Sequence, residues 1–83
     1  MINVLVTSVG GGVGQSVVDS ISHLNEYHIV GLDISANVYA RTQCNEFHIS
    51  KRISDPDYLN FLLNICKKHN IHVLVPGNDG ELV

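Results

Sequence analysis

Length, composition and charge limit this chain to one small domain and exclude several kinds of partner. The chain has 83 residues, of which 45% are hydrophobic and 16% are charged, and its formal net charge is -3. A chain of this length buries about 60–65% of its unfolded surface, so the core is modest. The five Lys and Arg residues form no basic stripe, which argues against nucleic acid as a partner. No apolar run approaches the ~20 residues that span a bilayer, which argues against a membrane-spanning segment.

The first predicted element is a strand over Ile2–Thr7, because an almost continuous apolar run is typical of a parallel strand buried on both faces. Four glycines follow within five positions, and a helix is expected from Val13 onward. Asn25 is expected to end that helix in the left-handed conformation. The apolar positions that trace its buried face are Val13, Val17, Val18, Ile21 and Leu24.

The middle of the chain predicts two more strands with an irregular connection between them. His28–Asp33 has an apolar centre and is the second predicted strand. A short helix is expected over Val38–Thr42, and Glu46–Ile49 is the third predicted strand.

A second helix and a fourth strand follow. Asp55 is expected to cap this helix, with Pro56 at its first position, where a missing N–H has no cost. Asn70 is expected to close the helix, and Ile71–Val75 is the fourth predicted strand. The stripe expected to face the core consists of Tyr58, Phe61, Leu62, Ile65 and Cys66.

This order of elements predicts an α/β fold: a Rossmann-like three-layer sandwich over residues 1–83, with a parallel four-stranded sheet in the order 3-2-1-4. In such a sheet, ligands bind beyond the carboxyl ends of the strands, at the point where the strand order reverses. The loop after the first strand should therefore face the residues after Val75. The last residues read as a loop and the first turn of a helix, so the chain is expected to be truncated after strand four, as a fragment of a longer parent. An uncovered fourth strand would then favour self-association.

The glycine-rich loop is the first candidate site, because closely spaced glycines let backbone N–H groups approach an anion or a substrate. Its spacing is not that of a dinucleotide fingerprint, since Gln15 or Val17 stands where the last glycine belongs. That glycine permits close packing of helix on strand, which Val17 is expected to obstruct. The alternative is that the glycines only form the turn. The candidate residues are Gly10, Gly11, Gly12, Val13 and Gly14.

Acidic and amide side chains after the second and fourth strands are the remaining binding candidates. Asp33 stands where a carboxylate accepts hydrogen bonds from a ribose, although Asp also caps turns at such positions. Asn78, Asp79 and Glu81 would face the glycine loop and could meet an amine, or they could simply cap the next helix.

No catalytic residue and no metal ligand is predicted. The five histidines lack the spacing of metal motifs, and Ser8 and Ser16 have no His and acid at recognisable positions to activate them. Lys51 and Arg52 follow the third strand and could contact a phosphate, although a solvated pair of charges is the simpler interpretation. Cys44 and Cys66 are interpreted as reduced thiols, which indicates a cytoplasmic protein.

Taken together, these motifs resemble the amino-terminal (pre-ATP-grasp) domain of ATP-grasp enzymes, in the carbamoyl-phosphate-synthase-like branch. The motifs that carry the resemblance are Val4-Leu5-Val6-Thr7, Gly10-Gly11-Gly12-Val13-Gly14-Gln15-Ser16, Val30-Gly31-Leu32-Asp33, Asp55-Pro56-Asp57-Tyr58, Val73-Leu74-Val75-Pro76 and Asp79-x-Glu81-Leu82.

The resemblance implies a non-catalytic domain that borders a substrate and binds no cofactor of its own. It implies that the parent chain binds ATP and magnesium in later subdomains, converts a carboxylate substrate into an acyl phosphate, and couples it to an amine. The residues implied at the substrate edge are Gly11 to Gly14 and Asn78 to Glu81.

Two other functions are compatible with the sequence. The glycine loop and Asp33 allow an NAD(P)-binding domain of an oxidoreductase or epimerase, which Val17 disfavours. A ligand-sensing or interaction module on the same scaffold is the other, because a fold does not determine a function.

Overall fold

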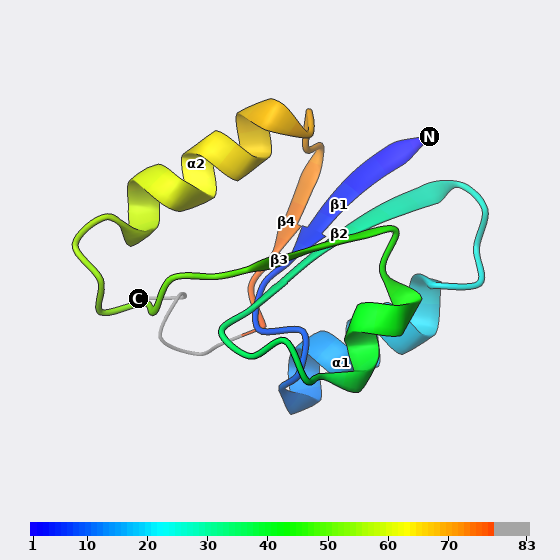
Figure 1. Ribbon diagram of the computed structural model, residues 1–83. Coiled ribbons are helices and arrows are strands. Elements are labelled where there is room, and N and C mark those ends of the chain that lie inside the picture. The colour runs from blue at the N-terminus through cyan, green and yellow to red at the C-terminus, as the bar shows by residue number, and fades with distance from the viewer. Residues whose placement is uncertain (78–83) are drawn as a thin grey trace.

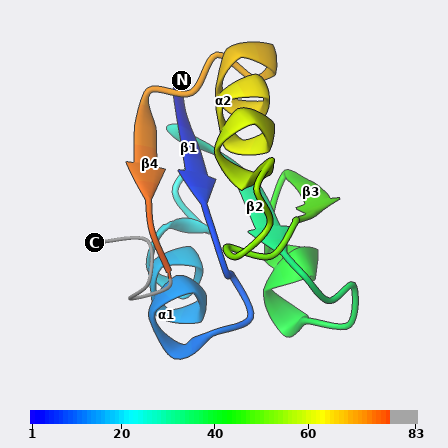
Figure 2. The same cartoon turned by 90° about the vertical axis from the view of Figure 1, so that its left-hand side faces the viewer.

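Four parallel strands form one sheet in the computed structural model, which describes residues 1–77 (Figure 1). The strands are β1 (Ile2–Val6), β2 (Tyr27–Asp33), β3 (Glu46–Ile49) and β4 (Val73–Val75). Their order is β3-β2-β1-β4, and Figure 2 shows β1 between β2 and β4. The predicted Rossmann-like α/β class and the strand order 3-2-1-4 are therefore confirmed.

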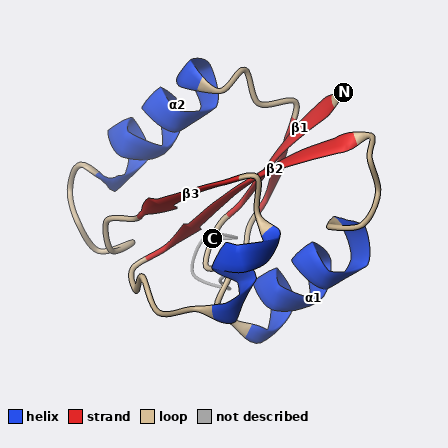
Figure 3. Ribbon diagram, turned by 45° about the vertical axis from the view of Figure 1, so that its right-hand side comes forward, coloured by secondary structure: helices blue, strands red, loops and turns tan. Residues whose placement is uncertain are grey.

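Helices cover both faces of the sheet and complete three layers (Figure 3). Helix α1 (Gly12–Ile21) and the 3₁₀ helix η1 (Tyr39–Gln43) lie on one face, and α2 (Tyr58–Lys68) lies on the other. The short helix predicted around residues 38–42 is thus present as a 3₁₀ helix. None of the helices described is long and apolar enough to cross a membrane.

The core consists of two apolar layers separated by the sheet. Val4 and Val6 of β1 pack with Val18 of α1 on one face, whereas Leu5 packs with Ile65 of α2 on the other. This alternation follows from the two-residue period of a strand. Each fully buried aliphatic side chain contributes about 1.5–3 kcal/mol of transfer free energy to folding. Because β1 places buried side chains on both faces of the sheet, it stabilises both layers.

The predicted start of α2 is wrong by two residues. Asp55 does not cap the helix: its carboxylate accepts a hydrogen bond from the N–H of Asp57 (2.8 Å), and its carbonyl accepts one from the N–H of Tyr58 (3.0 Å). Residues 55–58 therefore form a turn with Pro56 at its second position, which is the preferred place for proline in a type I turn. The helix begins only at Tyr58. Its predicted end is confirmed, since Asn70 has the left-handed φ of 54°.

The predicted end of α1 is also wrong. The helix ends at Ile21 and not near Leu24, and Asn25 is not left-handed. The N–H of Leu24 bonds to the carbonyl of Ile21, and the N–H of Tyr27 bonds to that of Leu24. These tight turns lead the chain into β2 without a left-handed cap. Val13, expected in the core, is 54% exposed.

The outer strand β4 is shorter than the predicted segment 71–75. Within residues 1–77 it pairs only with β1. Val73 and Leu74 are 45% and 44% exposed, so both faces of this strand are incompletely covered.

Candidate functional site

The loop after β1 turns sharply at a serine. Ser8 adopts a left-handed φ of 50°, and its carbonyl accepts a hydrogen bond from the N–H of Gly11 (2.9 Å). The N–H of Val9 donates to the carbonyl of Leu32 in β2 (3.0 Å). No glycine in the described residues has a positive φ, so the glycines are not needed here for a left-handed turn.

Gly14 provides the close packing of α1 on this loop. A Cβ atom at residue 14 would overlap the Ser8 carbonyl and lie 2.8 Å from the Cα of Val9. At residue 17, where the fingerprint places its last glycine, Val17 packs, partly buried, against the core cluster. The close approach occurs one turn earlier in the helix than the fingerprint spacing suggested.

Asp33 connects the end of β2 to the glycine loop. Its Oδ2 accepts a hydrogen bond from the N–H of Gly10 (2.8 Å), and its Oδ1 accepts one from the N–H of Ser35 (3.0 Å). A Cβ atom on Gly10 would lie 2.9 Å from Asp33 Oδ2 and 2.6 Å from Val38 Cγ1, so this contact requires glycine. Asp33 thus stabilises the turn that follows it and orients the start of the glycine loop.

Gly77, after β4, reaches the start of the connection between β1 and the glycine loop, as the strand order predicts. The N–H of Gly77 donates to the Thr7 hydroxyl (3.1 Å), and the N–H of Thr7 donates to the Val75 carbonyl (3.1 Å). The predicted candidates Asn78, Asp79 and Glu81 lie outside the described residues.

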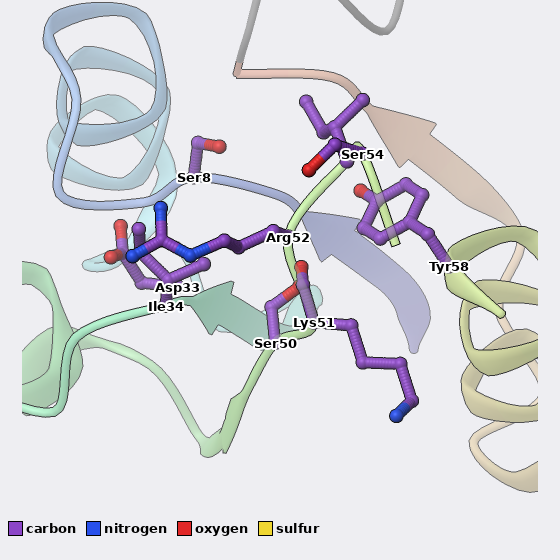
Figure 4. A pocket seen from close by; sticks show the side chains of 9 residues that line it. Ser8, Asp33, Ile34, Ser50, Lys51, Arg52, Ser54 and Tyr58 are labelled. Atoms are coloured by element: carbon purple, nitrogen blue, oxygen red, sulfur yellow. The ribbon is translucent and has the colours of Figure 1, made fainter. Parts of the chain in front are cut away.

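A cavity of about 470 Å³ opens beside this loop, at the carboxyl edge of the sheet (Figure 4). It lies between the ends of β1, β2 and β3 and the beginning of α2, and polar side chains form much of its wall. Figure 4 shows the Arg52 side chain extending across the opening toward Asp33. The lining residues are Ser8, Asp33, Ile34, Ser50, Lys51, Arg52, Ile53, Ser54 and Tyr58.

Most of these lining residues were not among the predicted site residues; only Asp33 was. For Lys51 and Arg52, the sequence favours a solvated pair of charges over a contact with phosphate. Their position directly after a predicted parallel strand was the available signal, since the carboxyl ends of parallel strands share one edge. The apolar pattern predicts Tyr58 in the core stripe of α2, whereas the later start of that helix places it at the cavity wall.

The residues around this cavity carry hydrogen-bonding and charged side chains. Arg52 provides a cationic donor, whereas Lys51 extends away from Ser8 and Asp33 (Figure 4), and Asp33 adds a carboxylate. Ser8 and Ser54 provide hydroxyl groups, the Ser50 hydroxyl donates to the Lys51 carbonyl, and the lining includes no His or Cys. Within residues 1–77, no three His, Cys, Asp or Glu side chains form a group that could hold a metal ion. The cavity is therefore suited to a small anionic or polar molecule.

Comparison with known protein families matches residues 4–83 to one family model, described as "PylC-like, N-terminal domain". The match covers nearly the whole chain. Among curated proteins, no sequence matches the chain.

Proposed function

Because the chain belongs to the family of PylC-like N-terminal domains, the amino-terminal domains of ATP-grasp ligases, we propose that it forms the substrate side of a carboxylate–amine ligase active site. The domain itself is non-catalytic. The parent enzyme, of the carbamoyl-phosphate-synthase-like branch, transfers the γ-phosphate of ATP to a substrate carboxylate. An amine then displaces phosphate from the resulting acyl phosphate, so that ADP, phosphate and an amide are released.

The cavity at the carboxyl edge of the sheet is the observation that carries this proposal. It lies where ligands bind in open α/β sheets. Its cationic and hydroxyl donors suit a carboxylate or an amino acid, and the hydrogen bond from Gly10 to Asp33 holds the adjacent loop in place. Gly11 to Gly14 border the same edge. Asn78 to Glu81 are proposed to face it from the other side.

ATP and magnesium are assigned to later subdomains of the parent chain. The described residues include no carboxylate cluster that fits a metal ion, and no lysine in the glycine loop that could reach a phosphate. Bound elsewhere, the metal–nucleotide complex would supply the phosphoryl group. This domain would position the acceptor and exclude water from the acyl phosphate.

The NAD(P)-binding alternative has less support. In a dinucleotide site, the N–H groups at the start of the glycine loop hold the pyrophosphate. Here the N–H of Gly10 donates to Asp33 Oδ2, and the other carboxylate oxygen accepts from Ser35. The carboxylate that would bind a ribose is therefore engaged with the chain itself.

The free edge of β4 is proposed as the surface on which the rest of the parent chain packs. Val73 and Leu74 are exposed there, and the strand has a single neighbour among the described residues. The isolated 83-residue chain should consequently self-associate. Sedimentation analysis tests this, and a monomer at high concentration would contradict it. Both thiols, Cys44 and Cys66, are free, in keeping with a cytoplasmic parent.

The parent enzyme provides the decisive assay. ADP release is measured with ATP and a panel of amino acids, and hydroxylamine is added to trap the acyl phosphate as a hydroxamate. Arg52→Gln should raise the KM for the acceptor about tenfold or more, as expected for a lost charge-assisted hydrogen bond, and leave the KM for ATP unchanged. Lys67→Gln, on the exposed end of α2, is the matched control. Tight binding of NAD(P)H without any ADP release would refute the proposal.

A further inference from the structure

Three histidines and one glutamate meet away from the cavity, where the end of α2 packs against β2 and β3. Glu46 Oε2 lies 2.9 Å from Nδ1 of His69 and 3.4 Å from Nε2 of His28. Nε2 of His48 lies 3.1 Å from Nε2 of His69. These four residues are called the histidine cluster below. The His69 side chain is only 10% exposed, so these contacts are partly shielded from water.

The hydrogen-bond roles in this cluster follow from the glutamate. The pKa of Glu46 is lowered, first by the hydrogen bond from His28 and then by the nearby imidazoles, so its carboxylate accepts hydrogen bonds. His69 must therefore donate from Nδ1, which leaves Nε2 of a neutral His69 as an acceptor. The Nε2–H of His48 donates to it, and a continuous chain runs from His48 through His69 to Glu46.

This chain tolerates one additional proton and not two. If one imidazole takes up a proton from water, the pair still has one donor and one acceptor at its 3.1 Å contact. If both rings are cationic, each Nε2 carries a hydrogen and no acceptor remains. Two positive charges then face each other, with Lys68 of α2 as a third nearby.

We propose that His48 and His69 form a pH-sensitive latch, which fastens the end of α2 to β3 and opens when both rings are protonated. His48 belongs to β3, and His69 directly follows α2, so the contact joins two separate elements. The same elements lead to the cavity: β3 runs into Ser50, and α2 begins at Tyr58. Opening the latch would therefore loosen one wall of the cavity, whatever ligand the cavity binds.

The electrostatics set the direction of this response. Burial lowers the pKa of His48, the charges of His69 and Lys68 lower it further, and Glu46 opposes them. A histidine with a lowered pKa in the folded state binds fewer protons than in the unfolded chain. The latch is therefore fully closed above the ordinary histidine value of 6.5, and it opens as the pH falls from that value through the lowered pKa of His48, where the second ring is protonated.

Nuclear magnetic resonance of the 83-residue chain tests the latch directly. Long-range ¹H–¹⁵N spectra follow the imidazoles from pH 8 to pH 4.5. His48 and His69 should titrate as a coupled pair in two steps. Exchange protection of the His69 amide, which bonds to the Ile65 carbonyl, should fall about fivefold or more with the second step, relative to Val6 in β1.

Two variants separate the latch from simple packing. His48→Gln retains a side-chain N–H donor that does not titrate, so the protection of the His69 amide should lose its pH dependence. In the His28→Gln variant, the changed side chain has Glu46 as its hydrogen-bond partner within residues 1–77, so the variant should keep the two-step titration. Independent one-step titration of His48 and His69, or a His69 amide whose protection is equal at pH 7 and pH 5, would overturn the proposal. If the His48→Gln variant does not fold, the titration of the wild-type chain by itself tests the proposal.

Discussion

Replacing Gly14 with alanine is the sharpest test of how the glycine loop is built. By helix propensity alone, Gly14→Ala should stabilise α1 by up to about 1 kcal/mol. The structure predicts the opposite sign. The new Cβ would overlap the Ser8 carbonyl and lie 2.8 Å from the Cα of Val9, and both neighbours are backbone atoms that cannot rotate away.

The expected loss can be estimated from these two opposing effects. Overpacking of a tight contact costs about 1–3 kcal/mol, and more where backbone must move. Because both neighbours of this Cβ are backbone atoms, the upper part of that range applies, about 2–3 kcal/mol, and subtracting about 1 kcal/mol of propensity gain leaves a net loss of about 1–2 kcal/mol. In a domain of this size, each kcal/mol shifts the Tm by about 4–8 °C. Gly14→Ala should therefore lower the Tm by about 4–16 °C.

Gly12→Ala is the matched control for this experiment. Gly12 belongs to the same first turn of α1, and among residues 1–77 no atom outside its chain neighbours and the helix's own backbone lies within 4 Å of a Cβ built there. Both variants therefore change backbone entropy and propensity similarly, and their difference isolates the contact at residue 14. Unfolding is followed by circular dichroism with heat and with urea. A Gly14→Ala variant that is as stable as Gly12→Ala would refute the assignment of Gly14 as the close-packing position.

Three further predictions concern the core, the site and a thiol. Leu5→Ala should lower the free energy of unfolding by about 2–5 kcal/mol in urea titrations. Leu63→Ala, at a residue that is 49% exposed, should change it by about 0.5 kcal/mol or less. Equal losses in the two variants would contradict the described core. Asp33→Ala removes the acceptor of the Gly10 N–H and should speed amide exchange at Gly10 about tenfold; unchanged exchange would show that this bond does not hold the loop. Burial raises the pKa of the Cys44 thiol from 9.0 to about 11, so less thiolate is present at pH 8. Alkylation by iodoacetamide, followed by mass spectrometry, should be about a hundredfold slower than in urea, and equal rates would contradict the burial.

The binding edge was only partly accessible to sequence reasoning. The position of Asp33 at the end of β2 was visible from the chain, but its partners, Gly10 and Ser35, were not. The position of Lys51 and Arg52 after a predicted parallel strand places them at the carboxyl edge of the sheet, but nothing along the chain indicates that they share a cavity with Ser8. A cavity is formed by segments far apart in sequence, and no local pattern records its shape.

The parallel sheet and its strand order follow from the sequence by itself, because apolar periodicity and chain connectivity are local properties that the folded domain preserves. β1 illustrates this: its uninterrupted apolar run requires cover on both faces, which only a central strand has. Tertiary structure alone decided which glycine admits close packing, where α2 begins, and that His48 meets His69. Each of these depends on contacts between distant segments, where tenths of an ångström and the direction of one hydrogen bond determine the outcome.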